Sequence, residues 1–358
     1  MSMADAWSLA LRRDDLATTE LRDEAVPDIG AGEVLLRVDR VGLSANNVTY
    51  ALMGDAMHYW DFFPTTEGWG LVPLWGFGEV VSSETDGVAV GSRVYGYFPS
   101  ASHVVVKAGA VDETRFKAVD ENRVKLPSPY NSYTVTAHDP AYEADREDLL
   151  ILFRPLFFTS YMLADQLEDN AFYGASALAM SSASSKTAYG AAFLLQGHGA
   201  EMIGLTSPGN VAFTESLGCY DRVVAYDAIS ELDATTPTAY LDVAGSADLR
   251  NRLRDHLGDQ LVRDVVIGVT HQEQGGGGGL AASGTEFFFA PNQMRKRTGD
   301  WGRPVLDQRF ADAWLRFAPT AEKWVEVVPH EGPSALRDVW LEVLGGQMSP
   351  RVGHVIQL

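Results

Sequence analysis

The sequence predicts an α/β protein with a β-rich domain and a second domain in which strands and helices alternate around a parallel sheet. Two observations lead to this prediction. The chain has 358 residues, more than one hydrophobic core usually organises. The pattern of apolar residues also changes near Leu149, where short runs between turn residues give way to longer segments with one apolar face.

The β-rich domain is expected first in the chain. Its apolar runs are short and are separated by glycine and proline, which favours strands joined by tight turns. These runs are 33–39, 78–82, 92–96 and 103–107. Near the other end of the chain, strands are predicted at 324–328 and 351–358 with a helix at 332–345, and we expect them to rejoin this domain.

The second domain is expected between these two parts. Apolar faces predict helices at 149–165 and 187–197. Buried strands are predicted at 177–180, 202–205, 222–225, 239–243 and 264–269. Their alternation with helices implies a parallel sheet with right-handed crossovers. The predicted domains are therefore 1–145 with 312–358 for the discontinuous β-rich domain, and 146–311 for the other.

Charge and composition narrow the classes of partner. Lys and Arg number 28 against 48 Asp and Glu, and the net charge of −20 would repel a phosphate backbone or an anionic lipid surface. We therefore expect no nucleic-acid partner and no membrane. The single Cys219 allows no intrachain disulfide, and no secretory signal or apolar stretch of ~20 residues is present. A cytoplasmic location is expected.

A turn of small residues after the strand at 177–180 is the most informative segment. Strand, small-residue turn and helix form the unit by which a Rossmann fold presents backbone N–H groups to a pyrophosphate. The usual G-x-G-x-x-G pattern is absent, and serine hydroxyls and a lysine stand in its place. The residues predicted to bind a cofactor here are Ser182, Ala183, Ser184, Ser185, Lys186 and Thr187.

Two other interpretations of this turn remain. It also fits a serine-capped helix in a purely structural βαβ unit. Ser185-Lys186-Thr187 is similar to the end of the nucleoside-triphosphate motif G-x-x-x-x-G-K-[ST]. Met180 and Ser185 occupy the two glycine positions of that motif, which disfavours this second interpretation.

The end of the second strand bears on the choice of dinucleotide. NAD sites usually carry a carboxylate there that binds the ribose 2′-hydroxyl. The sequence 205–210 has none, so NADP is favoured over NAD, with Thr206, Ser207 and Asn210 as hydrogen-bonding groups for a 2′-phosphate. No Arg or Lys lies in this turn to pair with that phosphate.

Several segments, taken in order, resemble the medium-chain dehydrogenase/reductase superfamily, specifically its zinc-free quinone oxidoreductase-like branch. They are Gly32-Glu-Val-Leu-Leu-Arg-Val-Asp39 continuing to Asn47, Trp75-Gly-Phe-Gly-Glu-Val-Val81 continuing to Gly96, 217–226, 242–246 and 351–358. The resemblance spans most of the chain. It implies a GroES-like β-barrel domain, a Rossmann domain and an active site in the cleft between them. The serine-rich turn departs from the superfamily's glycine-rich turn.

The same resemblance also indicates whether the protein binds zinc. Zinc-dependent members hold structural zinc with four clustered cysteines, which one cysteine cannot supply, and no Gly-His-Glu segment occurs at 68–79. We therefore expect no metal. Without a Lewis acid, hydride transfer from NADPH to a quinone or an activated C=C bond is the favoured chemistry.

Candidate site residues follow from this chemistry, which needs hydrogen-bond donors where charge develops on oxygen. Asn46, Tyr50 and Tyr59 are the predicted catalytic residues, and either tyrosine is a candidate proton donor, although each also fits a packed aromatic residue. Further predicted cofactor contacts, from the resemblance and from strand ends, are Thr159, Tyr226, Ala244, Gly245, Val269, Phe288 and Phe289.

The predicted function is a zinc-independent, NADPH-dependent oxidoreductase of quinones or enones, acting as a homodimer on a small-molecule substrate. A non-catalytic NADPH-binding redox sensor is the alternative from another class. A reductase of carrier-bound acyl groups is a third.

Overall fold

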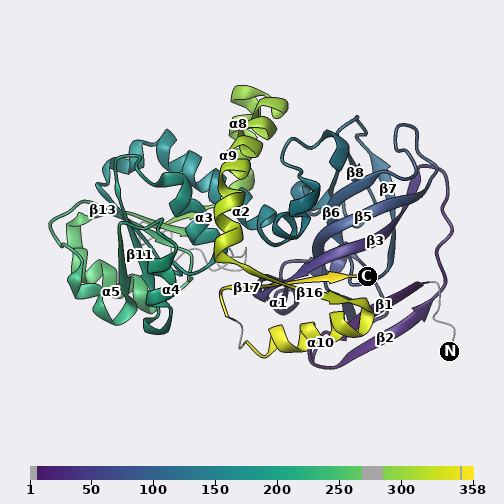
Figure 1. Ribbon diagram of the computed structural model, residues 1–358, viewed down its shortest axis with the longest axis horizontal. Helices are drawn as coiled ribbons and strands as arrows, with labels where there is room; N and C mark the ends of the chain where they lie inside the picture. The colour runs from purple at the N-terminus through teal and green to yellow at the C-terminus, as the bar shows by residue number, and fades with distance from the viewer. Residues whose placement is uncertain (1–5, 268–284, 347–348) are drawn as a thin grey trace. The chain divides into compact units, whose positions relative to one another are not determined.

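The computed structural model describes residues 6–267, 285–346 and 349–358, which divide into two units (Figure 1). Unit 1 joins Met1–Leu152 with Val325–Leu358, and unit 2 is Phe153–Trp324. The sequence predicted boundaries after residues 145 and 311. The second of these falls inside a continuous helix, α9 (Arg303–Trp324), whose apolar side chains are buried in unit 2.

An antiparallel barrel forms the centre of unit 1. Strand β3 (Glu33–Leu43) pairs with β5 on one side and with β7 on the other, so the strands close on themselves in the order β3-β5-β6-β9-β8-β7. Closure leaves none of these strands with a free edge. The bounds of the others are β5 Leu74–Ser83, β6 Arg93–Phe98, β7 His103–Gly109, β8 Arg115–Ala118 and β9 Ser132–Val135.

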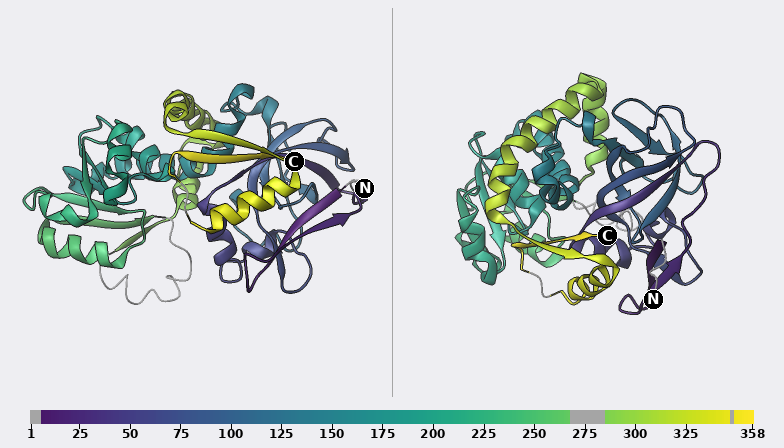
Figure 2. Two further views of the ribbon diagram at one scale, coloured as in Figure 1. Left: turned by 60° about the horizontal axis from the view of Figure 1, so that its bottom comes forward. Right: turned by 45° about the vertical axis from the view of Figure 1, so that its right-hand side comes forward.

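The C-terminal segment is part of the same unit. Strand β17 (Val352–Gln357) pairs antiparallel with β3, and β16 (Glu326–Glu331) pairs parallel with β17. A three-stranded sheet lies beside them, with β1 (Ala6–Arg12) between β2 (Thr19–Glu24) and β4 (Trp69–Leu71). Figure 2 shows helix α10 (Gly332–Leu344) lying along the β1–β2 pair.

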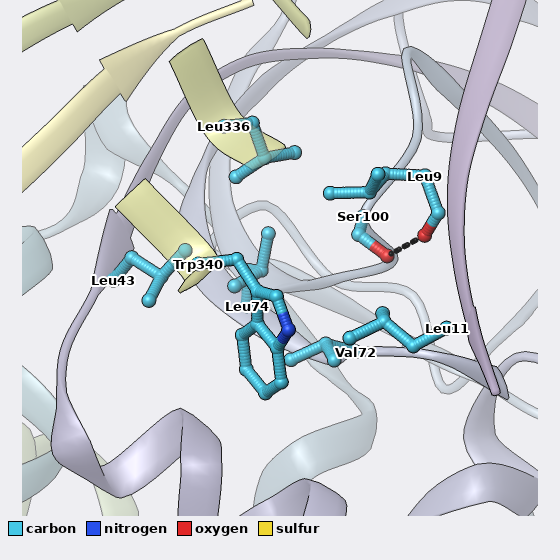
Figure 3. Close-up of a pocket in the computed structure, with 8 residues that line it drawn as sticks. All are labelled: Leu9, Leu11, Leu43, Val72, Leu74, Ser100, Leu336 and Trp340. Carbon is cyan, nitrogen blue, oxygen red and sulfur yellow. Dashed lines mark hydrogen bonds between the residues drawn. The ribbon is translucent and has the colours of Figure 1, made fainter. Parts of the chain in front are cut away.

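Helix α10 covers the apolar core of unit 1 with Leu336 and Trp340, which are both almost fully buried. The indole N–H of Trp340 donates to the carbonyl oxygen of Leu16 at 2.9 Å. Beneath the helix is an apolar cavity of about 10 Å³, which is at the lower limit for one water molecule (Figure 3). The cavity is a packing defect of the core. It is lined by Leu9, Leu11, Leu43, Val72, Leu74, Ser100, Leu336 and Trp340.

Unit 2 is built on a parallel sheet with the strand order β12-β11-β10-β13-β14-β15. Numbered along the chain, this order is 3-2-1-4-5-6, which is the Rossmann order. The bounds are β10 Ala177–Met180, β11 Glu201–Thr206, β12 Arg222–Ala225, β13 Thr238–Asp242, β14 Leu261–Ile267 and β15 Glu286–Phe288. The predicted fold class, a GroES-like barrel with a Rossmann sheet, is confirmed.

Helices α2, α3 and α9 pack together in unit 2. Gly190 of α3 allows close approach to α2, because a Cβ there would lie 2.8 Å from the Ser160 Oγ. Phe157 of α2 stacks on Phe317 of α9 with ring centres 4.4 Å apart. None of the helices in the described residues combines the length and the hydropathy needed to cross a bilayer. The bounds are α2 Glu147–Asp169, α3 Lys186–Leu195, α4 Val211–Ser216, α5 Ala247–Leu257 and α8 Ala290–Trp301.

Candidate functional site

The serine turn of unit 2 lies where the order of the parallel strands reverses. It follows β10, which has β11 on one side and β13 on the other. Helix α3 begins directly after it, with Ser185 as the N-cap: the Ser185 hydroxyl accepts from the N–H of Ala188 at 3.4 Å. In open parallel sheets this reversal creates a crevice at the carboxyl ends of the strands, and ligands bind there. The predicted turn and helix start are both found at this point.

The conformation of the turn shows how small residues other than glycine form it. Ser182 has φ +52°, a left-handed conformation that glycine adopts more readily. Ala183 is fully buried and faces Gly204 of β11, where an added Cβ would lie 3.0 Å from the Ala183 Cβ. A small residue in the turn and a glycine in the strand therefore let the turn pack tightly on the sheet.

Several backbone N–H groups of the turn are bonded within the protein. The N–H of Ser182 donates to the hydroxyl of Tyr226 at 2.9 Å, and that of Ala183 donates to the carbonyl of Leu205 at 3.1 Å. Within the described residues, the N–H groups of Ser184 and Thr187 make no hydrogen bond. These two are the amides of the turn and first helical turn that an anion can take without displacing a partner.

Ser181 connects the turn to the loop that follows β13. Its hydroxyl donates to Asp242 Oδ1 at 3.0 Å and accepts from the N–H groups of Val243 and Ala244, both at 3.0 Å. This single side chain thus holds the two loops on either side of the strand-order reversal. The predicted contact residue Ala244 is consequently fixed next to the serine turn.

Asp242 is a fully buried carboxylate at the end of β13. It pairs with Arg250 of α5 at 2.5 Å, and its Oδ1 also accepts from the N–H of Gly245 at 2.9 Å. A buried carboxylate needs such partners because desolvation penalises an unpaired charge. Sequence reasoning missed Ser181, Asp242 and Arg250, although an aspartate that ends an apolar strand, followed by an arginine in the first turn of the next helix, is a signal that the sequence contains.

The end of β11 meets the serine turn through side chains. Thr206 is buried, and Asn210 donates from Nδ2 to the Ser184 hydroxyl at 3.3 Å. The segment 205–210, which includes Ser207, carries no carboxylate. The structure therefore brings residues predicted to bind the diphosphate next to residues predicted to bind the 2′-phosphate.

Lys186 is the first residue of α3 and is half-buried. Its Nζ lies 5.8 Å from the ring centre of Phe153 in α2. Desolvation by burial lowers the pKa of this amine to about 8. The ammonium is thus held in an environment where an approaching anion would stabilise its charge.

The remaining predicted cofactor residues are more scattered. Thr159 lies on α2, where its hydroxyl donates to the carbonyl of Pro155 at 3.2 Å. Its neighbour Ser160 makes the contact to α3, with the hydroxyl 2.7 Å from the carbonyl oxygen of Thr187. Thr159 is therefore close to the site in sequence but is bonded within its own helix.

Strand β15 forms one edge of the sheet and carries the predicted phenylalanines. Phe288 is buried, whereas Phe289 follows the strand and is 37% exposed. The homodimer expected from the sequence stays a prediction. Val269, the last predicted cofactor residue, lies outside the described residues.

In unit 1, the three predicted catalytic residues lie together. Asn46 and Tyr50 are on helix α1 (Ala45–Leu52), and Asn46 Nδ2 lies 2.7 Å from the Tyr50 hydroxyl. Tyr59 begins the 3₁₀ helix η1 (Tyr59–Phe62), and its ring centre is 4.6 Å from that of Tyr50. One helix and the adjoining short helix thus gather the polar groups into one aromatic cluster.

These tyrosines are buried and therefore neutral. Tyr50 is 5% exposed and Tyr59 is 9% exposed. Burial raises the pKa of Tyr50 far above the ordinary value of a phenol, and it raises the pKa of Tyr59 to about 12. Each keeps its proton at physiological pH, which suits both a hydrogen-bond donor and a packed aromatic residue.

Sequence reasoning missed other members of this cluster, among them Trp75 and Tyr130. Trp75 of β5 donates its indole N–H to the Tyr50 hydroxyl at 3.4 Å. Tyr130, in the 3₁₀ helix η2 (Ser128–Asn131), has its ring centre 6.1 Å from that of Tyr59. Nothing local in the sequence marks Tyr130, because the contact joins segments that are distant along the chain.

The donor set of the described residues does not favour a metal centre. Among them, no three His, Cys, Asp or Glu side chains gather in an arrangement that could hold a metal ion. Cys219 is buried, and burial raises the pKa of its thiol to about 12, so the thiolate form that binds metals is strongly disfavoured.

Comparisons with known proteins agree with the architecture. Residues 41–349 match the family described as "Protein of unknown function (DUF2855)". No curated protein sequence matches the chain.

Among solved structures, a putative NADPH:quinone reductase from Mesorhizobium loti is similar over 100% of both chains, with TM-score 0.63 and 16% identity. The mycobacterial protein Rv1454c, solved with NADPH, is similar over 99% of this chain and 100% of its own, with TM-score 0.59 and 13% identity. CurA from Vibrio vulnificus, also solved with NADPH, gives TM-score 0.57 and 12% identity over 95% of this chain and 94% of its own. These identities show a shared fold.

Proposed function

The chain belongs to the DUF2855 family of proteins of unknown function, and we propose that it is an NADPH-dependent oxidoreductase. The proposed reaction is the transfer of a hydride to a quinone or to an α,β-unsaturated carbonyl compound. The proposal includes that the reaction proceeds without zinc.

The position of the serine turn is the observation that carries this proposal. The turn lies between β10 and β13, where the strand order reverses, and leads directly into α3. At this place a Rossmann sheet binds a dinucleotide, and the helix N-terminus attracts the diphosphate. The N–H groups of Ser184 and Thr187 and the ammonium of Lys186 are the donors that we assign to it.

The end of β11 supports NADPH over NADH. A carboxylate would repel a 2′-phosphate, and the segment 205–210 has none. Thr206, Ser207 and Asn210 offer two hydroxyls and an amide in its place. Because no arginine or lysine lies in this segment, we expect a preference for NADPH that is smaller than a charge-paired site would give.

When bound, NADPH supplies the hydride. The chain's own part is to hold the acceptor and to provide a proton where charge develops on oxygen. Tyr50 and Tyr59 are neutral phenols that can donate, and Asn46 orients the Tyr50 hydroxyl. This proposed mechanism needs no Lewis acid. It is consistent with the buried thiol of Cys219, because the thiolate form that binds metals is disfavoured there.

The names of the solved structures with a similar fold support the proposal. The Mesorhizobium protein is named as a putative NADPH:quinone reductase, and two other similar structures contain NADPH. An opposing observation is that Ser182 and the loop after β13 already have internal partners for their N–H groups. That arrangement leaves fewer N–H groups of these loops to donate to a diphosphate.

A two-step experiment tests the proposal. The chain is titrated with NADPH and with NADH, with quenching of tryptophan fluorescence and thermal stabilisation as readouts. NADPH oxidation is then followed with small quinones and enones, before and after treatment with a chelator. We expect tighter binding of NADPH and turnover that the chelator leaves unchanged. Binding without turnover would favour the sensor, and no binding would reject both.

A further inference from the structure

Three consecutive amides at the start of the serine turn have three different kinds of partner. The N–H groups of Ser181 and Ala183 donate to main-chain carbonyls of β13 and β11, at 3.0 and 3.1 Å. The N–H of Ser182, between them, donates to a side chain instead, the hydroxyl of Tyr226 at 2.9 Å. The amide at the point of strand-order reversal is therefore bonded to a group that can rotate.

The side chain of Tyr226 can leave the turn while its main chain stays in place. Tyr226 follows β12 and begins the 3₁₀ helix η7 (Tyr226–Glu231), and its ring is half-buried at the edge of an apolar cluster. Its carbonyl oxygen accepts from Arg252 Nη2 at 2.6 Å, which fixes the main chain. Within the described residues, its hydroxyl has no hydrogen bond other than the one from Ser182. Rotation of the side chain therefore breaks a single hydrogen bond.

A diphosphate is a stronger acceptor than a phenol for the Ser182 N–H. Hydrogen bonds to an ionised acceptor are roughly twice as strong as those between neutral groups. The phenol oxygen and a phosphate oxygen would occupy the same position in front of this N–H, so only one of them can take its bond with good geometry. When no ligand is bound, the phenol satisfies an amide for which the sheet provides no main-chain acceptor.

We propose that the Tyr226 hydroxyl is an internal competitor of the dinucleotide: it holds the Ser182 N–H in the free protein and releases it to the diphosphate when NADPH binds. This inference rests on the function proposed above, and it adds Ser182 to the donors assigned there. Because the bond to Tyr226 must break first, the free protein binds NADPH less tightly than the same turn would without the phenol.

A second tyrosine bonded to the same turn provides a matched control. Tyr220, which precedes β12 and is also half-buried, donates its hydroxyl to the carbonyl oxygen of Ala183 at 2.9 Å. Tyr220→Phe frees that carbonyl oxygen, which has no proton to offer a phosphate. Tyr226→Phe instead frees an N–H. The two variants therefore make the same chemical change at adjacent residues of the turn, and only one of them exposes a donor.

The binding test titrates the full chain and both variants with NADPH and with NADH. Tyr226→Phe should bind NADPH about 2- to 12-fold more tightly, because the bond to the phenol no longer has to break. NADH should gain by the same factor, since it has the same diphosphate. Tyr220→Phe should bind neither dinucleotide more tightly. Unchanged or weaker binding by Tyr226→Phe, a change confined to NADPH, or equal gains in the two variants would overturn the inference.

Urea denaturation tests the same bond without relying on the titration. In the free protein, Tyr226→Phe should unfold at a lower urea concentration than the original chain, because it lacks the hydrogen bond to Ser182. With saturating NADPH the two proteins should unfold at the same urea concentration, because the bond is absent from both complexes. A difference that persists with NADPH would mean that Tyr226 keeps its bond in the complex, and it would reject the inference.

Turnover with small quinones and enones separates this inference from the proposed function. If Tyr226→Phe gains affinity but neither it nor the original chain oxidises NADPH, the competition by Tyr226 is supported and the reductase function is rejected. If the original chain oxidises NADPH and Tyr226→Phe gains no affinity, the competition alone is rejected. If neither protein binds a dinucleotide, both are rejected.

Discussion

Replacing Lys186 with methionine should raise the free energy of unfolding of the free protein and lower its affinity for NADPH. The pKa of this amine falls from 10.5 to about 8 through desolvation, which corresponds to ~3 kcal/mol spent on holding the charge. Methionine keeps the apolar stem next to Phe153 and removes the charge. At neutral pH we therefore expect the variant to be more stable by up to ~3 kcal/mol, measured by urea denaturation.

The lowered pKa of Lys186 also predicts how the stability changes with pH. The unfolded chain keeps Lys186 protonated up to pH about 10.5, whereas the folded chain releases the proton near pH 8. The unfolded state thus binds more protons between these values, and the stability of the original chain should rise across this window. That rise should be absent in Lys186→Met.

The affinity for NADPH, in contrast to the stability, should fall in Lys186→Met. Loss of one charge-assisted hydrogen bond to the diphosphate, worth ~1.5–3 kcal/mol, would weaken NADPH about 10- to 150-fold. Because a bound anion favours the protonated amine, the original chain should also take up protons on binding above pH 8, measurable by calorimetry in buffers of different ionisation enthalpy. Lys323→Met, at an exposed position of α9, is the control. Unchanged NADPH affinity in Lys186→Met would remove Lys186 from the site, and lower stability would refute the desolvation argument.

Three further substitutions test packing, two of them at the site and one in the core of unit 1. Gly204→Ala puts a Cβ 3.0 Å from that of Ala183, so it should cost ~1–3 kcal/mol of stability and weaken NADPH, and an unchanged affinity would mean that the turn's position does not matter. Ser181→Ala removes a partner from two N–H groups and from Asp242, with an expected loss of ~1–3 kcal/mol in urea denaturation. A neutral result there would show that water replaces the hydroxyl. Leu336→Ala enlarges the cavity of unit 1 and should cost ~2–5 kcal/mol without changing NADPH affinity.

Much of the fold could be read from local patterns. The predicted strands 177–180 and 222–225 agree with β10 and β12, and helix α3 begins where the small residues end. Buried parallel strands are short apolar runs, and a serine cap marks a helix start, so the signals are local. Helix α9 was missed although its buried Leu306, Phe310, Trp314 and Phe317 recur at helical spacing.

Other elements had no such signal. Residues 6–12 form strand β1, which is stabilised as a strand by pairing with β2 and β4. Pairing of this kind depends on partners elsewhere in the chain, and local propensity does not reveal them. The same reason explains why the position of Tyr130 in the aromatic cluster was not predicted.

The sequence by itself determined the parallel strands β10 to β14, the small-residue turn before α3 and the absence of a carboxylate after β11. Each of these depends on residues that are neighbours along the chain. Tertiary structure decided that the N–H of Ser182 is bonded to Tyr226, that Ser181 is bonded to Asp242, and that Tyr130 packs against Tyr50 and Tyr59. A hydrogen bond depends on distance and direction in space, and these are set only when segments far apart in the chain pack together.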